Sequence, residues 1–147
     1  MSDTLQANAQ GIRELIAFRL GAQEYSVDVT AVREIRGWTP ATRLPHSPDY
    51  VLGVINLRGQ ALPIVDLAAR MGFAPAEPTS RHAIIVAEIE NEDVGLLVDG
   101  VSEIFSATEE SIQPTPDIAC GMARSFVRGV IPGEGRMISV LALERIL

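Results

Sequence analysis

The sequence predicts a mainly β protein with two similar halves, each closing into a small barrel and packing on the other. Two observations carry this prediction. Apolar and polar residues alternate over short stretches, the pattern of half-buried strands. These stretches also recur without gaps, residues 14–35 matching 83–104 and residues 53–67 matching 129–143. Short open sheets leave unpaired edges, and closure into a barrel removes them.

The length of 147 residues favours a single domain with a substantial core. Residues 1–12 are predicted to be a flexible N-terminal tail and residues 13–147 the folded domain. Within the domain, we expect one subdomain over about 13–73 and a second over about 81–147. The segment between them holds two prolines and no periodicity, as a linker does.

The pattern predicts the elements of the first half in order. They are a hairpin of residues 16–20 and 25–29, a helical turn over 30–35 capped by Thr30, strands over 50–57 and 61–65, and a short helix between Asp66 and Gly72. Pro63 donates no hydrogen bond, so its strand should lie at a sheet edge or carry a bulge there.

The second half repeats this plan with one insertion. The offset between the matched segments grows from 69 to 76, which places seven extra residues within 108–124. Residues 84–87 are apolar at every position, as expected of a strand that faces its barrel core on one side and the other half on the other.

Charge and composition exclude several classes of partner. The net charge is −7, and all of it lies in residues 74–147. Phosphate backbones require a basic surface, so no nucleic-acid partner is expected. No apolar run reaches 18 residues, so no direct membrane insertion is expected. A single cysteine, Cys120, and the lack of a secretory signal point to the cytoplasm.

No catalytic, cofactor-binding or metal-binding residue is predicted. His46, His82 and Cys120 form no cluster with zinc-ligand spacing, and residues 88–93 lack the spacing of a calcium loop. Asp66 follows a strand, where a catalytic or phosphorylated carboxylate can lie, but a helix N-cap is the better interpretation. A small enzyme or ligand-binding barrel that uses Asp66 or Cys120 is the rival hypothesis.

The polar tip Asn56–Gly59 is the first candidate for function. It has the composition of a hairpin turn in which Gly59 supplies a positive φ. However, Leu57 and Arg58 are types of residue that anchor interfaces, and the matching tip 132–135 has neither. The fold therefore does not require them. Glu34 on pattern alone is a solvated position, and Trp38 suits either a core or an interface.

Four segments together resemble the CheW family of bacterial chemotaxis adaptors. They are VREIRG at 32–37, GVINLRG at 53–59, PIVDL at 63–67 and GLLVDGVSEI at 95–104. The resemblance runs from about residue 14 to residue 147. It implies two SH3-like five-stranded β-barrel subdomains around a shared core, with short helices.

The resemblance also implies a function. It implies a non-catalytic, cytoplasmic adaptor, recruited to membrane receptor arrays, that couples methyl-accepting chemoreceptor tips to the regulatory domain of the histidine kinase CheA. The same adaptor role in a pathway such as pilus motility is the alternative. Residues assigned to partner binding are Glu34 and Arg58, their neighbours Asn56 and Leu57, and three groove positions, Val32, Val98 and Val101.

Overall fold

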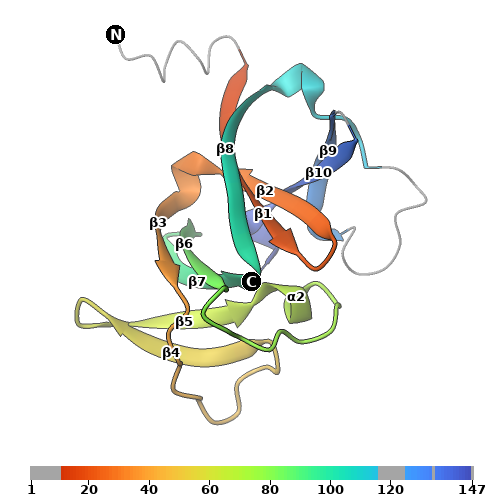
Figure 1. Ribbon diagram of the computed structural model, residues 1–147. Helices are drawn as coiled ribbons and strands as arrows, with labels where there is room; N and C mark the ends of the chain where they lie inside the picture. The colour runs from red at the N-terminus through yellow and green to blue at the C-terminus, as the bar shows by residue number, and fades with distance from the viewer. Residues whose placement is uncertain (1–10, 116–124, 134, 147) are drawn as a thin grey trace, which may run out of the picture.

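The computed structural model describes residues 11–115, 125–133 and 135–146 (Figure 1). Its strands are β1 (Ile12–Leu20), β2 (Gln23–Asp28), β3 (Val32–Gly37), β4 (Val51–Leu57), β5 (Gln60–Asp66), β6 (Ala83–Ile89), β7 (Glu92–Val98), β8 (Gly100–Thr108), β9 (Val127–Gly133) and β10 (Arg136–Leu141). The helical elements are short, namely η1 (Val29–Ala31), α2 (Leu67–Arg70), η2 (Glu109–Ser111) and η4 (Leu143–Arg145). The predicted mainly β class is confirmed.

The strands form two five-stranded sheets with the same topology. Barrel one has the order β3-β6-β7-β5-β4, and barrel two has the order β8-β1-β2-β10-β9. Position by position, β3, β6, β7, β5 and β4 of barrel one correspond to β8, β1, β2, β10 and β9 of barrel two. The internal repeat of the sequence is therefore a repeat of the fold.

Each sheet is closed by the chain that follows its first strand. After β3, Thr42 and Val54 of β4 exchange two backbone hydrogen bonds of 2.9 Å. After β8, Gln113 and Val130 of β9 do the same at 2.8 Å. In each sheet the bridge joins the chain that follows the first strand to the last strand in the order. Neither sheet therefore keeps a long open edge.

The strands are exchanged between the two halves of the sequence. Barrel one combines β3, β4 and β5 with β6 and β7, while barrel two combines β1 and β2 with β8, β9 and β10. The expectation that residues 13–73 and 81–147 would each close their own barrel is wrong in this respect. The chain passes from barrel two to barrel one through η1, which joins β2 to β3. It returns to barrel two at Asp99, which joins β7 to β8.

The core has one shared cluster and one cluster that belongs to barrel one. The shared cluster takes side chains from both sheets, including Phe18, Tyr25, Ile85 and Leu96. The smaller cluster lies within barrel one and comprises Ile55, Leu62, Ile64, Ile84, Val86 and Leu97. Alternate residues of β6 enter the two clusters, which confirms the prediction for a strand that is apolar on both faces.

Most local elements agree with the sequence pattern. Both predicted hairpins are present, and Asp66 caps α2 by accepting a hydrogen bond from the Ala69 amide. The helical turn expected over 30–35 is wrong: η1 ends at Ala31 and β3 begins at Val32. The Asp28 carboxylate caps η1, accepting from the amide and hydroxyl of Thr30. β1 begins at Ile12, and residues 1–10 of the predicted tail lie outside the described residues.

Candidate protein-interaction surface

The β4–β5 hairpin ends in a two-residue turn with left-handed backbone at both positions. Arg58 has φ 53° and Gly59 has φ 83°, as in a type I′ turn. The positive φ of Gly59 was predicted, whereas that of Arg58 was not. The Asn56 side-chain oxygen accepts a hydrogen bond from the Gly59 amide at 2.8 Å, so Asn56 holds the turn in shape. The hairpin projects from one end of the molecule (Figure 1).

The structure brings together Glu34 on β3 and Arg58 in the β4–β5 turn. Arg58 Nη1 donates to Glu34 Oε1 at 2.8 Å. The Arg58 side chain is 74% exposed and the Glu34 side chain 25% exposed, so the pair faces solvent on its arginine side. Arg36 Nη1 lies 3.4 Å from the other Glu34 oxygen. One carboxylate is thus shared by two guanidinium groups, and the trio carries a net positive charge.

The arginines determine the electrostatics of this carboxylate. The hydrogen bond from Arg58 is the largest effect that lowers the pKa of Glu34, and the charges of Arg58 and Arg36 add to it. Burial opposes this shift without cancelling it. Glu34 is therefore ionised throughout the neutral range, and its negative charge keeps the Arg58 side chain in place.

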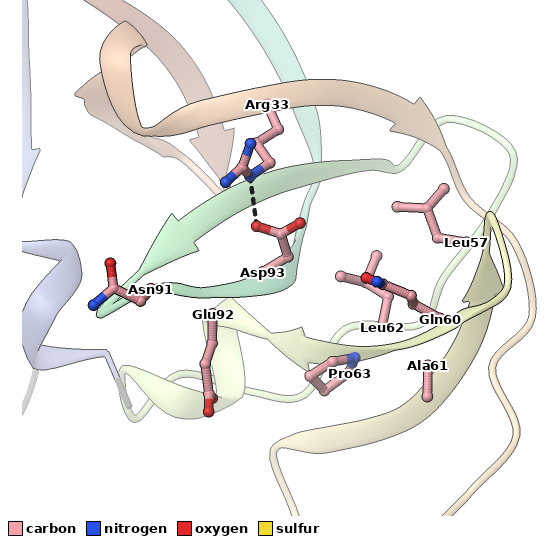
Figure 2. Close-up of a pocket in the computed structure, with 9 residues that line it drawn as sticks. All are labelled: Arg33, Leu57, Gln60, Ala61, Leu62, Pro63, Asn91, Glu92 and Asp93. Atoms are coloured by element: carbon pink, nitrogen blue, oxygen red, sulfur yellow. Dashed lines mark hydrogen bonds and ion pairs between the residues drawn. The ribbon is translucent and has the colours of Figure 1, made fainter.

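Leu57 joins this charged tip to the interior of barrel one. It is half-buried and packs against the smaller core cluster, as does Trp38. Leu57 also lies at the rim of a cleft between β5 and the β6–β7 hairpin (Figure 2). The tip therefore presents an apolar side chain and a cation side by side, the combination typical of an interface anchor.

The three predicted groove valines occupy different environments. Val32 and Val101 are half-buried against the shared core. They begin or nearly begin β3 and β8, directly after the chain crosses from one sheet to the other. Val98 is 0% exposed within the shared core. Its assignment to an exposed groove is wrong in this structure, because a side chain that fills the core cannot reach a partner.

Exposed apolar side chains on barrel two were not predicted. Ile104 on β8 is 61% exposed and Met137 on β10 is 50% exposed. Between these strands, Arg136 Nη1 lies 2.7 Å from Glu103. In the sequence repeat, Glu103 is the equivalent of Glu34 and Ile104 the equivalent of Ile35, and Ile35 is itself 42% exposed. This correspondence in the sequence was the available signal for these side chains.

Asp66, one of the two residues of the rival hypothesis, has structural partners. The Asp66 carboxylate is 1% exposed and accepts hydrogen bonds from the amides of Ala69 and Ala76, which fix α2 and the following linker. His82 Nδ1 accepts from the Thr79 amide at 3.0 Å. Among the described residues, no three histidines, cysteines or acids gather as a metal site would require. Cys120 lies outside the described residues.

Within the described part of the chain, no helix has the length and hydropathy needed to cross a membrane.

Comparisons with known proteins agree with this architecture. A family model described as the CheW-like domain matches residues 14–147. The probable chemotaxis protein CheW of Rhizobium etli is 58% identical over 144 residues, which cover 98% of this chain and 93% of that protein. Chemotaxis protein CheW of Rhizobium meliloti is also 58% identical, over 99% of this chain and 94% of its own length.

A solved structure shows the same fold. The crystal structure of the scaffolding protein TtCheW from Thermoanaerobacter tengcongensis superposes with a TM-score of 0.83 at 30% identity, covering 91% of this chain and 86% of that one. The match of the family model over nearly the whole chain and the two relatives at 58% identity lead to one conclusion: this chain belongs to the CheW family of chemotaxis proteins.

Proposed function

We propose that this protein is a non-catalytic, cytoplasmic adaptor that couples methyl-accepting chemoreceptors to the histidine kinase CheA and helps to assemble receptor arrays. The observation that carries the proposal is the Glu34–Arg58 pair at an exposed hairpin tip. The repeat supports it, because the matching tip of barrel two lacks Leu57 and Arg58 and yet has the same fold.

An adaptor needs at least two surfaces, and barrel two offers the second. Ile104 on β8 and Met137 on β10 are exposed, and the preceding residue of each strand, Glu103 and Arg136, forms an ion pair with the other. Methionine and aromatic residues are enriched at protein interfaces, so we infer that Met137, with Ile104, belongs to the second surface. The kinase regulatory domain and the receptor tip are the two partners proposed for these surfaces, with Val32 and Val101 as contacts for the receptor helices.

Binding measurements test the proposal directly. Arg58→Asp and Glu34→Lys are each expected to weaken binding to the CheA regulatory domain, or to a receptor signalling fragment, at least tenfold in calorimetry. The melting temperature should stay within about 3 °C, because exposed ion pairs contribute little to folding. Arg81→Asp is the matched control, since Arg81 is exposed and makes no ion pair among the described residues. Unchanged affinity for both partners in both variants would remove the tip from the proposal.

Deletion of the gene separates the two pathways. Loss of swimming chemotaxis is expected for the flagellar role, and loss of directed twitching would instead place the adaptor in a pilus-motility pathway.

A further inference from the structure

An open cleft of about 390 Å³ lies beside the hairpin tip, between β5 and β7. Residues 60–63 of β5 form one wall and residues 91–93 of the β6–β7 hairpin form the other (Figure 2). Leu57 and Arg33 complete the rim, and Arg33 donates to Asp93 at 2.6 Å. This volume falls within the range of roughly 300–1,000 Å³ that ligand sites occupy.

The cleft exists because two parallel strands separate. β5 and β7 pair only from Ile64 with Gly95 to Asp66 with Leu97. Pro63, the residue before this pairing begins, has no amide hydrogen to continue the ladder. The predicted sheet edge or bulge at Pro63 is wrong, because β5 lies between β7 and β4 and the register shift of the β4–β5 pair falls between Val51 and Gly53. Pro63 faces Val54 of β4 and is unpaired toward β7.

The equivalent strands of barrel two do not separate at this point. β10 and β2 pair from Ile138 with Glu24 to Val140 with Ser26. This pairing includes Ser139, the repeat equivalent of Pro63. The fold thus permits a closed ladder here, and barrel one departs from it.

A second difference between the barrels also leaves the cleft of barrel one open: Gln60 stands where barrel two has Arg136. In barrel two, Arg136 donates to Glu24 at 2.6 and 3.0 Å and so ties β10 to β2. The repeat equivalents in barrel one are Gln60 and Asp93. Gln60 carries no charge to bind Asp93, whose carboxylate is held instead by Arg33 at the rim. Pro63 and Gln60 together account for the opening.

We propose that this cleft receives a lysine or arginine side chain from the partner protein that binds the Arg58 tip. The inference rests on the proposed function and adds the chemistry of the docked segment. Leu57 makes the cleft continuous with the tip, and the lining is mainly polar, with Gln60 on one wall and Asn91 on the other. Glu92, on the same wall as Asn91, is exposed and has no ion pair among the described residues, so it attracts a basic side chain.

The test transfers the closing residues of barrel two into barrel one. The double variant Gln60→Arg with Pro63→Ser should fold and lose at least tenfold affinity for the partner that requires Arg58. The probes are the purified CheA regulatory domain and a receptor signalling fragment, each measured by calorimetry. A folded double variant that binds within twofold of the parent overturns the inference. If the double variant does not fold, Gln60→Arg alone is judged by the same criterion.

A matched pair of charge reversals tests whether Glu92 attracts the basic side chain of the partner. Glu92→Lys should weaken binding at least fivefold, whereas Glu90→Lys, on the same hairpin but outside the cleft, should change it less than twofold. Equal losses in the two variants overturn the assignment of Glu92. Arg58→Ala is measured in parallel. If Arg58→Ala loses binding and the cleft variants do not, only the inference about the cleft is refuted. Unchanged binding in Arg58→Ala removes the Arg58 tip from the proposed function, whereas failure of the parent protein to bind either probe refutes the proposed function itself.

Discussion

Glu34 and Arg58 lie 24 residues apart in the chain, yet their side chains meet at 2.8 Å across the rim of barrel one. β3 and β4 are the outer strands of the sheet, and the Thr42–Val54 bridge joins the chain that follows β3 to β4. The positive φ of Arg58 orients the turn that carries its guanidinium group. Barrel closure and turn geometry therefore act together to form the pair.

The first prediction concerns the pKa of Glu34. Arg58→Gln should raise it toward the ordinary glutamate value, because the largest stabilising contact of the carboxylate is removed. Arg36→Gln should raise it less, since Arg36 has the smaller influence. Carbon-detected NMR titration of the Glu34 carboxyl measures both. A pKa that is the same in Arg58→Gln and the parent would show that the pair does not persist in solution.

The same shift determines how pH acts on the pair. A lowered pKa in the folded state gives stability that is present above the unfolded value, roughly 4.3, and is lost as the pH falls through the folded value. The pair should thus persist from about pH 5 to pH 8. Partner affinity that depends on Glu34 should be flat over this range, and a midpoint near pH 7 would indicate a different titrating group.

The second prediction concerns the glycines at the barrel closures. A Cβ on Gly53 would lie 2.2 Å from the Thr42 carbonyl oxygen, at a φ of +140°. Gly53→Ala should destabilise the protein by about 3 kcal/mol or more, because backbone cannot move aside as a side chain does. Gly21→Ala is the control, with a positive φ but no atom within 4 Å, and should cost about 1 kcal/mol. Equal losses in chemical denaturation would contradict this account.

The third prediction separates structure from catalysis at Asp66. Asp66→Ala should cost about 2–3 kcal/mol, because two backbone amides lose their buried acceptor. Asp66→Asn keeps one acceptor oxygen and should cost less. Partner affinity of the folded protein should be unchanged in both variants. Intact stability combined with lost signalling would favour the rival hypothesis of a catalytic or phosphorylated aspartate.

The fourth prediction concerns Arg70, which joins the two halves of the chain. Its guanidinium carbon lies 4.9 Å from the Tyr50 ring centre and 4.7 Å from the Phe126 ring centre, and Nε donates to the Ile146 carbonyl. Arg70→Met should lower the free energy of unfolding by about 1–3 kcal/mol. Arg145→Met, which removes one exposed hydrogen bond to a backbone carbonyl, is the control and should cost less. A loss no larger than that of the control would leave the stacking without a role in stability.

The fifth prediction addresses the surface on barrel two. Ile104→Ser and Met137→Ser should leave stability nearly unchanged and weaken binding to one partner by about three- to tenfold. Phe73→Ser removes a side chain of similar exposure, 40%, in the linker and serves as the control. An effect confined to the partner that does not require Arg58 would identify two separate docking surfaces. No effect on either partner would return these residues to ordinary surface positions.

The sequence by itself determined the strands of the hairpins, their repeat and the residues that the repeat leaves unexplained, but not β3, which was expected to be a helical turn. Period-two alternation marks strands locally, and the matched offsets identified Leu57 and Arg58 as residues that the fold does not require. Asp66 as a cap and Gly59 as a turn residue followed from local backbone chemistry, which needs only neighbouring residues.

Only the tertiary structure decided which strands pair. Alternation records which side chains are buried but not which strand supplies the neighbouring backbone, so the exchange between halves was missed. For the same reason the sequence analysis assigned Val98 to a groove, although its side chain is buried in the shared core. The junction of Glu34 with Arg58, and the cleft that Pro63 and Gln60 leave open, arise from long-range pairing. These features depend on how distant strands close a barrel, which no local pattern contains.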